Sequence, residues 1–308
     1  MTETRRFLPP IALLGALWGP TNLFVKMAND TASPLAVASL RWWIAGAILL
    51  LLLRVPQFAS FMSLKWPSRA EALQAAAFGA FFFAPAQALY PLALKSTSSL
   101  EATVLLATGP VWTALLAIML LHEKVPARRW LMISVGLVGA YLVAVGFRLP
   151  EFESKHAIGN VVYVGAFAWE TVAWVLLSRT AKRSSGIGTL ACKIVGAMVM
   201  FLILSLTLRG DYGFTIYAVN ASMFISIGFL ILVPALICFS FWYKLAEQAP
   251  VSLMAIANIV QPVVGALMGW WFLHEEFTLP TAVGSTLILT ALLIGSREGK
   301  PSPEVASP

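Results

Sequence analysis

Charged residues are scarce in this sequence. Lys, Arg, Asp and Glu make up 11% of its 308 residues, whereas soluble domains carry about a quarter. Only two cysteines occur, Cys192 and Cys238, so no disulfide framework is expected. Hydrophobic residues reach 59% of the chain, which is more apolar surface than a soluble protein could bury. The composition therefore predicts a protein for which lipid is the main solvent.

Motifs typical of enzymes and of nucleic-acid binding are also missing. The formal net charge is +7, but the basic residues are spread over short loops and form no basic face. There is no GxxxxGKS or GxxxxGKT phosphate loop and no HExxH motif, and no nucleophile–base pair lies in an apolar segment. We therefore expect no enzyme activity, no cofactor, no metal and no nucleic-acid partner. An intramembrane enzyme and a channel are the less favoured alternatives.

Apolar segments make up most of the chain. A membrane-spanning helix needs about 20 mostly apolar residues, and ten such segments alternate with short loops. They cover residues 7–27, 34–54, 70–94, 98–121, 129–147, 157–178, 187–208, 221–245, 250–273 and 278–296. The predicted fold class is an all-α membrane protein with ten transmembrane helices. Residues 299–308, rich in Pro and Ser, are predicted to form a disordered tail.

The distribution of basic residues predicts the orientation of the chain. With the N-terminus inside, 14 Lys and Arg residues lie on the cytoplasmic side and 5 on the outer side. Short cytoplasmic loops are enriched in Lys and Arg. We therefore predict a multi-pass protein of the inner (plasma) membrane with both termini in the cytoplasm.

The chain repeats itself at an offset of 152 residues. LLHEK ends at Lys124 and FLHEE ends at Glu276. The same step relates four further pairs of residues: Trp18 and Glu170, Arg41 and Lys193, Tyr90 and Trp242, and Pro110 and Pro262. Each half, residues 1–148 and 157–296, holds five predicted spans. Because five is odd, the second half enters the membrane upside down, which predicts two inverted five-helix repeats around a central cavity.

Several motifs resemble one family of transporters. They are GALWG (Gly15–Gly19), LRWW (Leu40–Trp43) and the LHE ends of the fourth and ninth spans. Over about residues 7–296, the chain resembles the EamA-type permeases of the drug/metabolite transporter superfamily. The resemblance implies a transporter whose spans 1–4 and 6–9 surround the cavity, with spans 5 and 10 at the periphery. That family carries amino acids, amines, vitamins, nucleotide derivatives and drugs, so the substrate is left open.

Glu170 is the only acidic residue near the middle of a predicted span, and such residues are functional candidates. Helical periodicity places Tyr163 and Trp174 on the same face. Aromatic rings attract an organic cation and a carboxylate balances its charge. We therefore predict that Glu170 recognises an amine or quaternary ammonium substrate. Two alternatives are a structural ion pair with Lys193 or Arg41, and proton exchange that drives export of amino acids or other small metabolites or drugs.

Other polar and aromatic residues at similar depth complete the predicted site. Trp18 corresponds to Glu170 through the repeat, Asn22 lies one turn further along, and Gln87 and Tyr90 share a face of the third span. The predicted substrate-binding residues are Trp18, Asn22, Gln87, Tyr90, Tyr163, Glu170 and Trp174.

Three further predictions concern the buried basic residues, the prolines and the partners of the protein. Arg41 and Lys193 are expected to be structural, for example in an internal ion pair. Pro110 and Pro262 are expected to kink the fourth and ninth spans, because a proline inside a helix removes a hydrogen bond. The partners are expected to be a small-molecule substrate and the bilayer, with proton coupling open and with the protein a monomer or a homodimer.

Overall fold

The computed structural model describes residues 6–97, 102, 105–145, 147, 157–261, 263–264 and 278–296. These residues are predominantly helical, and the β-pairing found among them is one isolated bridge between Ala32 and Ile216. Pro262 and the predicted tail at 299–308 lie outside the described residues.

Six helical stretches are long and apolar enough to cross a membrane. They are Leu8–Asn29, Pro34–Leu52, Arg69–Ser96, Ala157–Arg183, Gly186–Thr207 and Ala221–Ala246. Shorter apolar helices cover Leu105–Leu121, Val251–Gln261 and Leu279–Ala291, and a further helix covers Ala127–Val145. Each of the ten predicted spans therefore contains helical residues. The chain is a multi-pass, all-helical membrane protein, and the crossing of the membrane by all ten segments stays a prediction.

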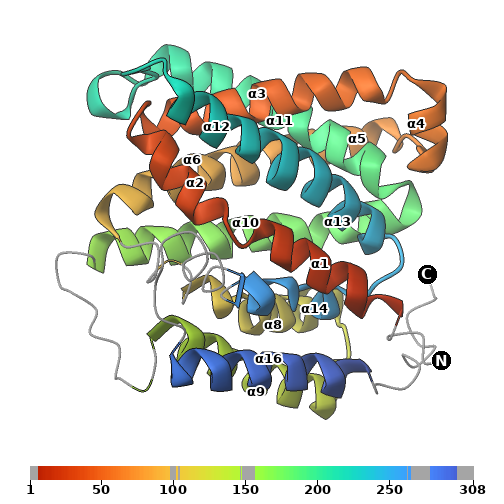
Figure 1. Cartoon of the computed structure of the whole chain (residues 1–308). Helices are drawn as coiled ribbons and strands as arrows, with labels where there is room; N and C mark the ends of the chain where they lie inside the picture. The colour runs from red at the N-terminus through yellow and green to blue at the C-terminus, as the bar shows by residue number, and fades with distance from the viewer. Residues whose placement is uncertain are drawn as a thin grey trace. The chain divides into compact units, whose positions relative to one another are not determined.

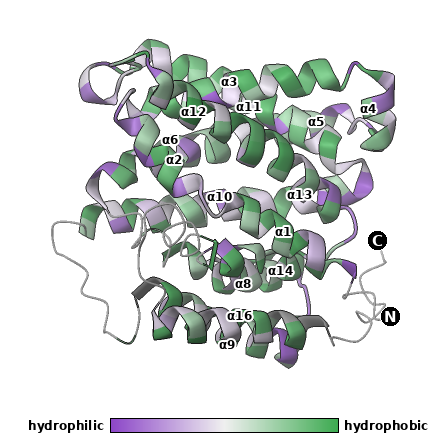
Figure 2. Ribbon diagram, in the orientation of Figure 1, coloured by the Kyte–Doolittle hydropathy of each residue, from purple (hydrophilic) through white to green (hydrophobic). Residues whose placement is uncertain are grey.

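The outer surfaces of these helices are strongly apolar. Figure 2 shows hydrophobic residues along the helices, with hydrophilic residues gathered mainly at their ends and in the loops. Leu73, Ile158 and Val161 are 73%, 76% and 72% exposed. Such faces suit contact with acyl chains, where backbone groups must be satisfied within each helix.

The chain divides into two compact units, each built from several separate segments of sequence. Unit 1 comprises Met1–Pro20, Thr103–Glu151 and Ala249–Pro308. Unit 2 comprises Thr21–Ala102 and Phe152–Gln248. Each unit thus takes helices from both halves of the sequence. The predicted division into repeats at 1–148 and 157–296 describes the sequence and differs from this spatial grouping.

Unit 1 contains α1 (Leu8–Trp18), α8 (Gly109–Leu121), α9 (Ala127–Val145), α14 (Val251–Met254) and α16 (Leu279–Ser296). Helices α9 and α16 lie side by side (Figure 1). A Cβ atom on Gly139 would lie 2.7 Å from the carbonyl oxygen of Gly284, and one on Gly284 would lie 2.5 Å from that of Gly139. These two glycines therefore let the backbones approach closely, as small residues do between membrane helices.

Unit 2 is built around α11. Its elements are α2 (Thr21–Asn29), α3 (Pro34–Leu52), α4 (Pro56–Phe61), α5 (Arg69–Phe78), the π-helix η2 (Gly79–Phe83), α6 (Ala84–Ser96), α10 (Ala157–Arg183), α11 (Gly186–Thr207), η4 (Gly210–Tyr212), α12 (Ala221–Leu230), the π-helix η5 (Ile231–Cys238) and α13 (Phe239–Ala246). Helix α11 packs against α3, α5, η2 and α13. A Cβ atom on Gly79 would overlap the carbonyl oxygen of Lys193, and one on Gly196 would overlap that of Ala76. Because these two glycines have no side chain, η2 and α5 can pack closely against the middle of α11.

Candidate functional site

Glu170 lies on α10 and accepts hydrogen bonds from two side chains of α6. The amide Nε2 of Gln87 donates to Glu170 Oε2 at 3.1 Å, and the hydroxyl of Tyr90 donates to the same oxygen at 3.0 Å. Because Gln87 and Tyr90 are three residues apart, they share one face of α6, which packs against α10. Three of the predicted binding residues therefore meet at one carboxylate.

Gln87 also joins this carboxylate to α3. Its Oε1 accepts hydrogen bonds from Arg41 Nη1 at 3.4 Å and from Trp42 Nε1 at 3.2 Å. Arg41 and Gln87 are both buried. The amide thus connects the guanidinium group of one helix with the carboxylate of another, and it uses both its donor and its acceptor to do so.

Two more predicted residues extend the same cluster. The hydroxyl of Tyr163 donates to Asn22 Oδ1 at 3.1 Å, and the rings of Tyr163 and Tyr90 have centroids 5.1 Å apart. Asn22 belongs to α2, so the cluster draws side chains from α2, α3, α6 and α10. The result is a connected group of polar and aromatic side chains in unit 2 that ends at Glu170.

Lys193 lies among aromatic rings. Its Nζ atom is 3.5 Å from the ring centroid of Phe83, 4.7 Å from that of Phe239 and 4.8 Å from that of Tyr243. The residue is only 3% exposed. Sequence reasoning did not find these three rings as a set. One signal was available, since the 152-residue offset relates Gln87, which contacts Arg41, to Phe239, which contacts Lys193.

The alternative of an ion pair between Glu170 and Arg41 or Lys193 is not found among the described residues. The ion pairs described there join Glu123 to Arg129 at 3.1 Å and Lys244 to Glu247 at 3.4 Å. Neutral donors hold the Glu170 carboxylate instead.

The indole N–H of Trp174 has no hydrogen-bond partner among the described residues, so Trp174 does not join the hydrogen-bonded cluster. The Trp174 ring contacts the rings of Trp242 and Tyr243, with centroids 5.2 and 5.4 Å away. Trp18 is the last residue of α1 and belongs to unit 1, whereas the other six predicted binding residues belong to unit 2. A role for Trp18 in the same site stays a prediction.

Pro110 stands in the first turn of α8. Residues 105–107 are helical, and Thr108 forms a turn before α8 begins at Gly109. The helix is therefore interrupted next to the proline. The kink predicted at its counterpart Pro262 falls on a residue outside the described ones.

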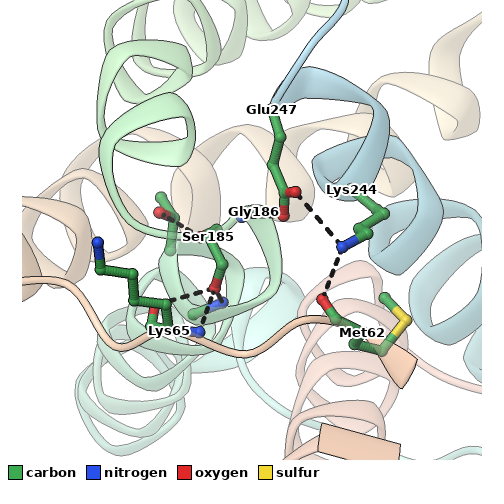
Figure 3. A network of polar contacts seen from close by, with 8 residues as sticks. Met62, Lys65, Ser185, Gly186, Lys244 and Glu247 are labelled. Atoms are coloured by element: carbon green, nitrogen blue, oxygen red, sulfur yellow. Dashed lines mark hydrogen bonds and ion pairs between the residues drawn. The ribbon is translucent and has the colours of Figure 1, made fainter. Parts of the chain in front are cut away.

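A second polar network lies at the start of α11 (Figure 3). Ser185 caps the helix by accepting from the backbone N–H of Gly188 at 3.1 Å, and it also donates to the carbonyl of Lys65 at 2.9 Å. Nearby, the backbone N–H of Gly186 donates to Glu247 Oε1 at 2.8 Å. The network ties the chain before α5 to the beginning of α11 and to the end of α13.

Lys244 completes this network at the end of α13. Its ammonium group donates to the carbonyl of Met62 at 3.1 Å and pairs with Glu247 at 3.4 Å. All of these residues lie on the predicted cytoplasmic side, away from Glu170 along the sequence-predicted spans. Their contacts hold unit 2 together and lie apart from the hydrogen-bonded group around Glu170.

Comparison with known proteins assigns the chain to a family. A model of the EamA-like transporter family matches residues 10–145 and again residues 158–297. The chain belongs to the EamA-like transporter family. It is therefore a membrane transporter rather than an enzyme, as its motifs predicted, and it has a small-molecule substrate.

Individual relatives agree with this assignment. An uncharacterized transporter of Archaeoglobus fulgidus is 24% identical over 290 residues, which is 94% of this chain and 98% of the relative. The S-adenosylmethionine/S-adenosylhomocysteine transporter of Chlamydia muridarum is 26% identical over 87% of this chain and 84% of its own length. The uncharacterized inner membrane transporter YedA of Escherichia coli K12 is 27% identical over 86% of this chain and 83% of its own length.

A crystal structure of another protein has a similar fold. It superposes with a TM-score of 0.73, covers 94% of this chain and 96% of its own, and shares 16% sequence identity. At this identity the likeness concerns the fold alone. Within the described residues, no group of three or more His, Cys, Asp or Glu side chains is placed to hold a metal ion.

Proposed function

We propose that this protein is a secondary-active transporter that moves a small organic metabolite across the inner (plasma) membrane by alternating access. The observation that carries the proposal is the double match of one family model, at residues 10–145 and 158–297. Two copies of a unit with five spans each would lie in opposite orientations. Under this proposal the chain crosses the membrane ten times, both termini are cytoplasmic, and each half can adopt the conformation of the other.

Glu170 is the residue that recognises a positively charged group of the substrate, in the preferred case an amine or quaternary ammonium. Its carboxylate is held by neutral Gln87 and Tyr90, so its charge is available to a ligand. The adjoining rings of Tyr90 and Tyr163 favour an organic cation. The Chlamydia relative supports a related class, because S-adenosylmethionine carries a sulfonium cation and an α-amino group.

A proton-coupled exporter of amino acids or other small metabolites is the second candidate. Glu170 interacts electrostatically with both Lys193 and Arg41, although no ion pair joins it to either among the described residues. A carboxylate in that position can exchange a substrate cation for a proton. Binding measured against pH separates the two candidates, because a permanently charged cation loses affinity when Glu170 is protonated.

Transport by purified protein in liposomes tests the proposal. Saturation and counterflow are expected for a carrier and would be missing for a channel. Glu170→Gln removes the charge and keeps the shape, and we expect it to lower the affinity for an amine substrate by about thirtyfold, as for loss of one partner of a buried charge pair. Asp30→Asn, which removes an exposed carboxylate between α2 and α3, is the matched control and should behave as the parent. Equal binding of amines by Glu170→Gln and the parent would refute the role of Glu170.

A further inference from the structure

Three ionisable side chains lie well inside the predicted spans of unit 2, and their charges do not balance. Arg41 and Lys193 are basic and only 8% and 3% exposed. Glu170 is the only acidic residue at this depth. Two buried basic groups therefore share one carboxylate, and with all three groups ionised the interior carries an excess positive charge. Removing a charge from water costs several kcal/mol unless a partner of opposite sign compensates.

Arg41 forms no ion pair with an acidic residue in the part of the chain that the structure describes. Its Nη1 donates to the neutral amide of Gln87, its guanidinium carbon lies 4.9 Å from the ring centroid of Trp42, and its buried Nε atom has no hydrogen-bond partner. A guanidinium group has five N–H donors in a planar fork that matches a carboxylate. At least the Nε donor of this group is unused.

Lys193 also forms no ion pair with an acidic residue in the described part of the chain. Its ammonium group contacts the faces of Phe83, Phe239 and Tyr243, and no hydrogen bond or ion pair of this group is found there. Ring faces attract a cation but do not neutralise its charge. The aromatic surroundings therefore orient the ammonium group, and Glu170 acts on its charge without forming an ion pair with it.

The two cations border one aromatic cluster. The Trp42 ring, which lies under Arg41, contacts the rings of Phe83 and Phe239 with centroids 4.6 and 5.2 Å away. Those are two of the rings that lie against Lys193. Gln87 connects Arg41 to Glu170 through two hydrogen bonds. Positive and negative groups thus lie in a single connected region of unit 2.

We propose that a carboxylate of the substrate supplies the missing negative charge, and that the transported molecule is a zwitterion. Its ammonium or sulfonium group pairs with Glu170, and its carboxylate pairs with Arg41 and Lys193. This inference rests on the proposed function and narrows it, because it rejects cations that lack a carboxylate. S-adenosylmethionine and S-adenosylhomocysteine, named for the Chlamydia relative, both carry an α-amino-acid group of this kind.

A matched panel of ligands tests the inference with the parent protein. The full chain in lipid nanodiscs is titrated with L-tryptophan, tryptamine and indole-3-propionate, with glycine betaine and choline, and with S-adenosylhomocysteine. A zwitterion should bind about thirtyfold or more tightly than its analogue lacking either charge. Choline or tryptamine binding as well as its zwitterionic counterpart would overturn the inference, and so would a panel in which no zwitterion binds.

Two variants separate charge recognition from a merely structural role. In Lys193→Met and Arg41→Gln, affinity for the zwitterion should fall toward that of the amine, while affinity for the amine stays the same or improves. A structural role would weaken both ligands equally. Lys182→Met removes an exposed lysine near the end of α10 and should change neither.

The melting temperature of the ligand-free protein provides a readout that needs no substrate. Lys193→Met should leave it unchanged or raise it, because the variant removes a buried charge that no ion pair compensates. A large fall would instead assign Lys193 to holding the fold. Transport of amines without preference for zwitterions would refute this inference alone, whereas absence of saturable transport of every ligand would refute the proposed function.

Discussion

Arg41 and Lys193 occupy positions 152 residues apart, on helices that begin in the same way, yet their surroundings differ. Ser33 caps α3 and Ser185 caps α11, each accepting from a backbone N–H three residues on. Ser33 donates to the carbonyl of Gly213 at 2.7 Å, as Ser185 donates to that of Lys65 at 2.9 Å. Each helix start therefore binds the loop that precedes the third or the eighth predicted span.

The packing of the two helices follows the same pattern. The π-helix η2 begins at Gly79 and packs against α11, whereas η5 begins at Ile231, which is 152 residues later, and packs against α3. Against this common frame, Arg41 contacts an amide and an indole, and Lys193 contacts three ring faces. The comparison indicates that the two regions share their helix caps and helix packing. They differ in the groups that surround the buried basic residue. π-Helical turns are frequent at functional sites.

Of the contacts compared, the one between η2 and α11 should lose the most stability when it is mutated. Gly79→Ala would force its new methyl group into the carbonyl oxygen of Lys193, because backbone cannot yield as a side chain can. We expect a loss of about 3 kcal/mol or more in the free energy of unfolding, typical of severe overpacking. Thermal unfolding in detergent measures it. Gly165→Ala on α10 has open space around it and should be neutral or slightly stabilising.

Removing the amide that serves Arg41 should have the next largest effect. Gln87→Leu leaves the donors of Arg41 and Trp42 and the acceptor of Glu170 without this partner. Buried groups left unsatisfied cost about 1–3 kcal/mol each, so we expect a loss of about 3 kcal/mol. Gln57→Leu, at an exposed position of α4, is the control. Equal melting temperatures for the two variants would show that the amide bridge contributes nothing to stability.

Phe239, the residue equivalent to Gln87 in the second half, can be changed to weaken the cation–π contacts of Lys193. Phe239→Leu keeps an apolar side chain and removes one ring, whose centroid lies 4.7 Å from Lys193 Nζ. We expect a loss of about 2 kcal/mol, since a desolvated cation–π contact contributes up to about that amount. Phe239→Tyr keeps a ring face and should lose less. If the loss of stability in a series of variants at Phe239 followed the volume of the new side chain and not the presence of a ring, the cation–π explanation would be wrong.

The two serine caps should give the smallest effects and nearly equal ones. Ser33→Ala and Ser185→Ala each remove a helix cap, for a loss of about 1 kcal/mol. Ser60→Ala, at an exposed site of α4, should be close to the parent. The losses are measured as shifts of the melting temperature. Clearly unequal shifts would show that the two helix starts have the same geometry but contribute differently to stability.

Helical periodicity and depth were enough to predict much of the candidate site. Tyr163 was selected because it shares a helix face with Glu170, and Gln87 and Tyr90 because they share a face of the third span at similar depth. The structure joins all three to one cluster with Glu170. Both rules depend on positions within one helix, which the sequence states directly. Depth also allowed an ion pair of Glu170 with Lys193 or Arg41 as an alternative, which is not found among the described residues, because depth alone does not say which neighbour a carboxylate faces.

The rings around Lys193 were beyond those rules. Phe83 comes from η2, whereas Phe239 and Tyr243 come from α13, and their meeting depends on how closely these elements pack against α11. That closeness follows from glycines such as Gly79, whose importance shows only when the neighbouring backbone is known. The grouping of helices into two units likewise depends on contacts between distant segments.

The network at the start of α11 joins three segments of the chain through several polar contacts (Figure 3). Glu247 holds both the first N–H of α11 and Lys244, which in turn holds the carbonyl of Met62. Moving the end of α13 away from α11 would break these contacts together, because Lys244 and Glu247 both lie at that helix end. Motion at this end of unit 2 should therefore be cooperative, with amide protons of the three segments exchanging at a common rate.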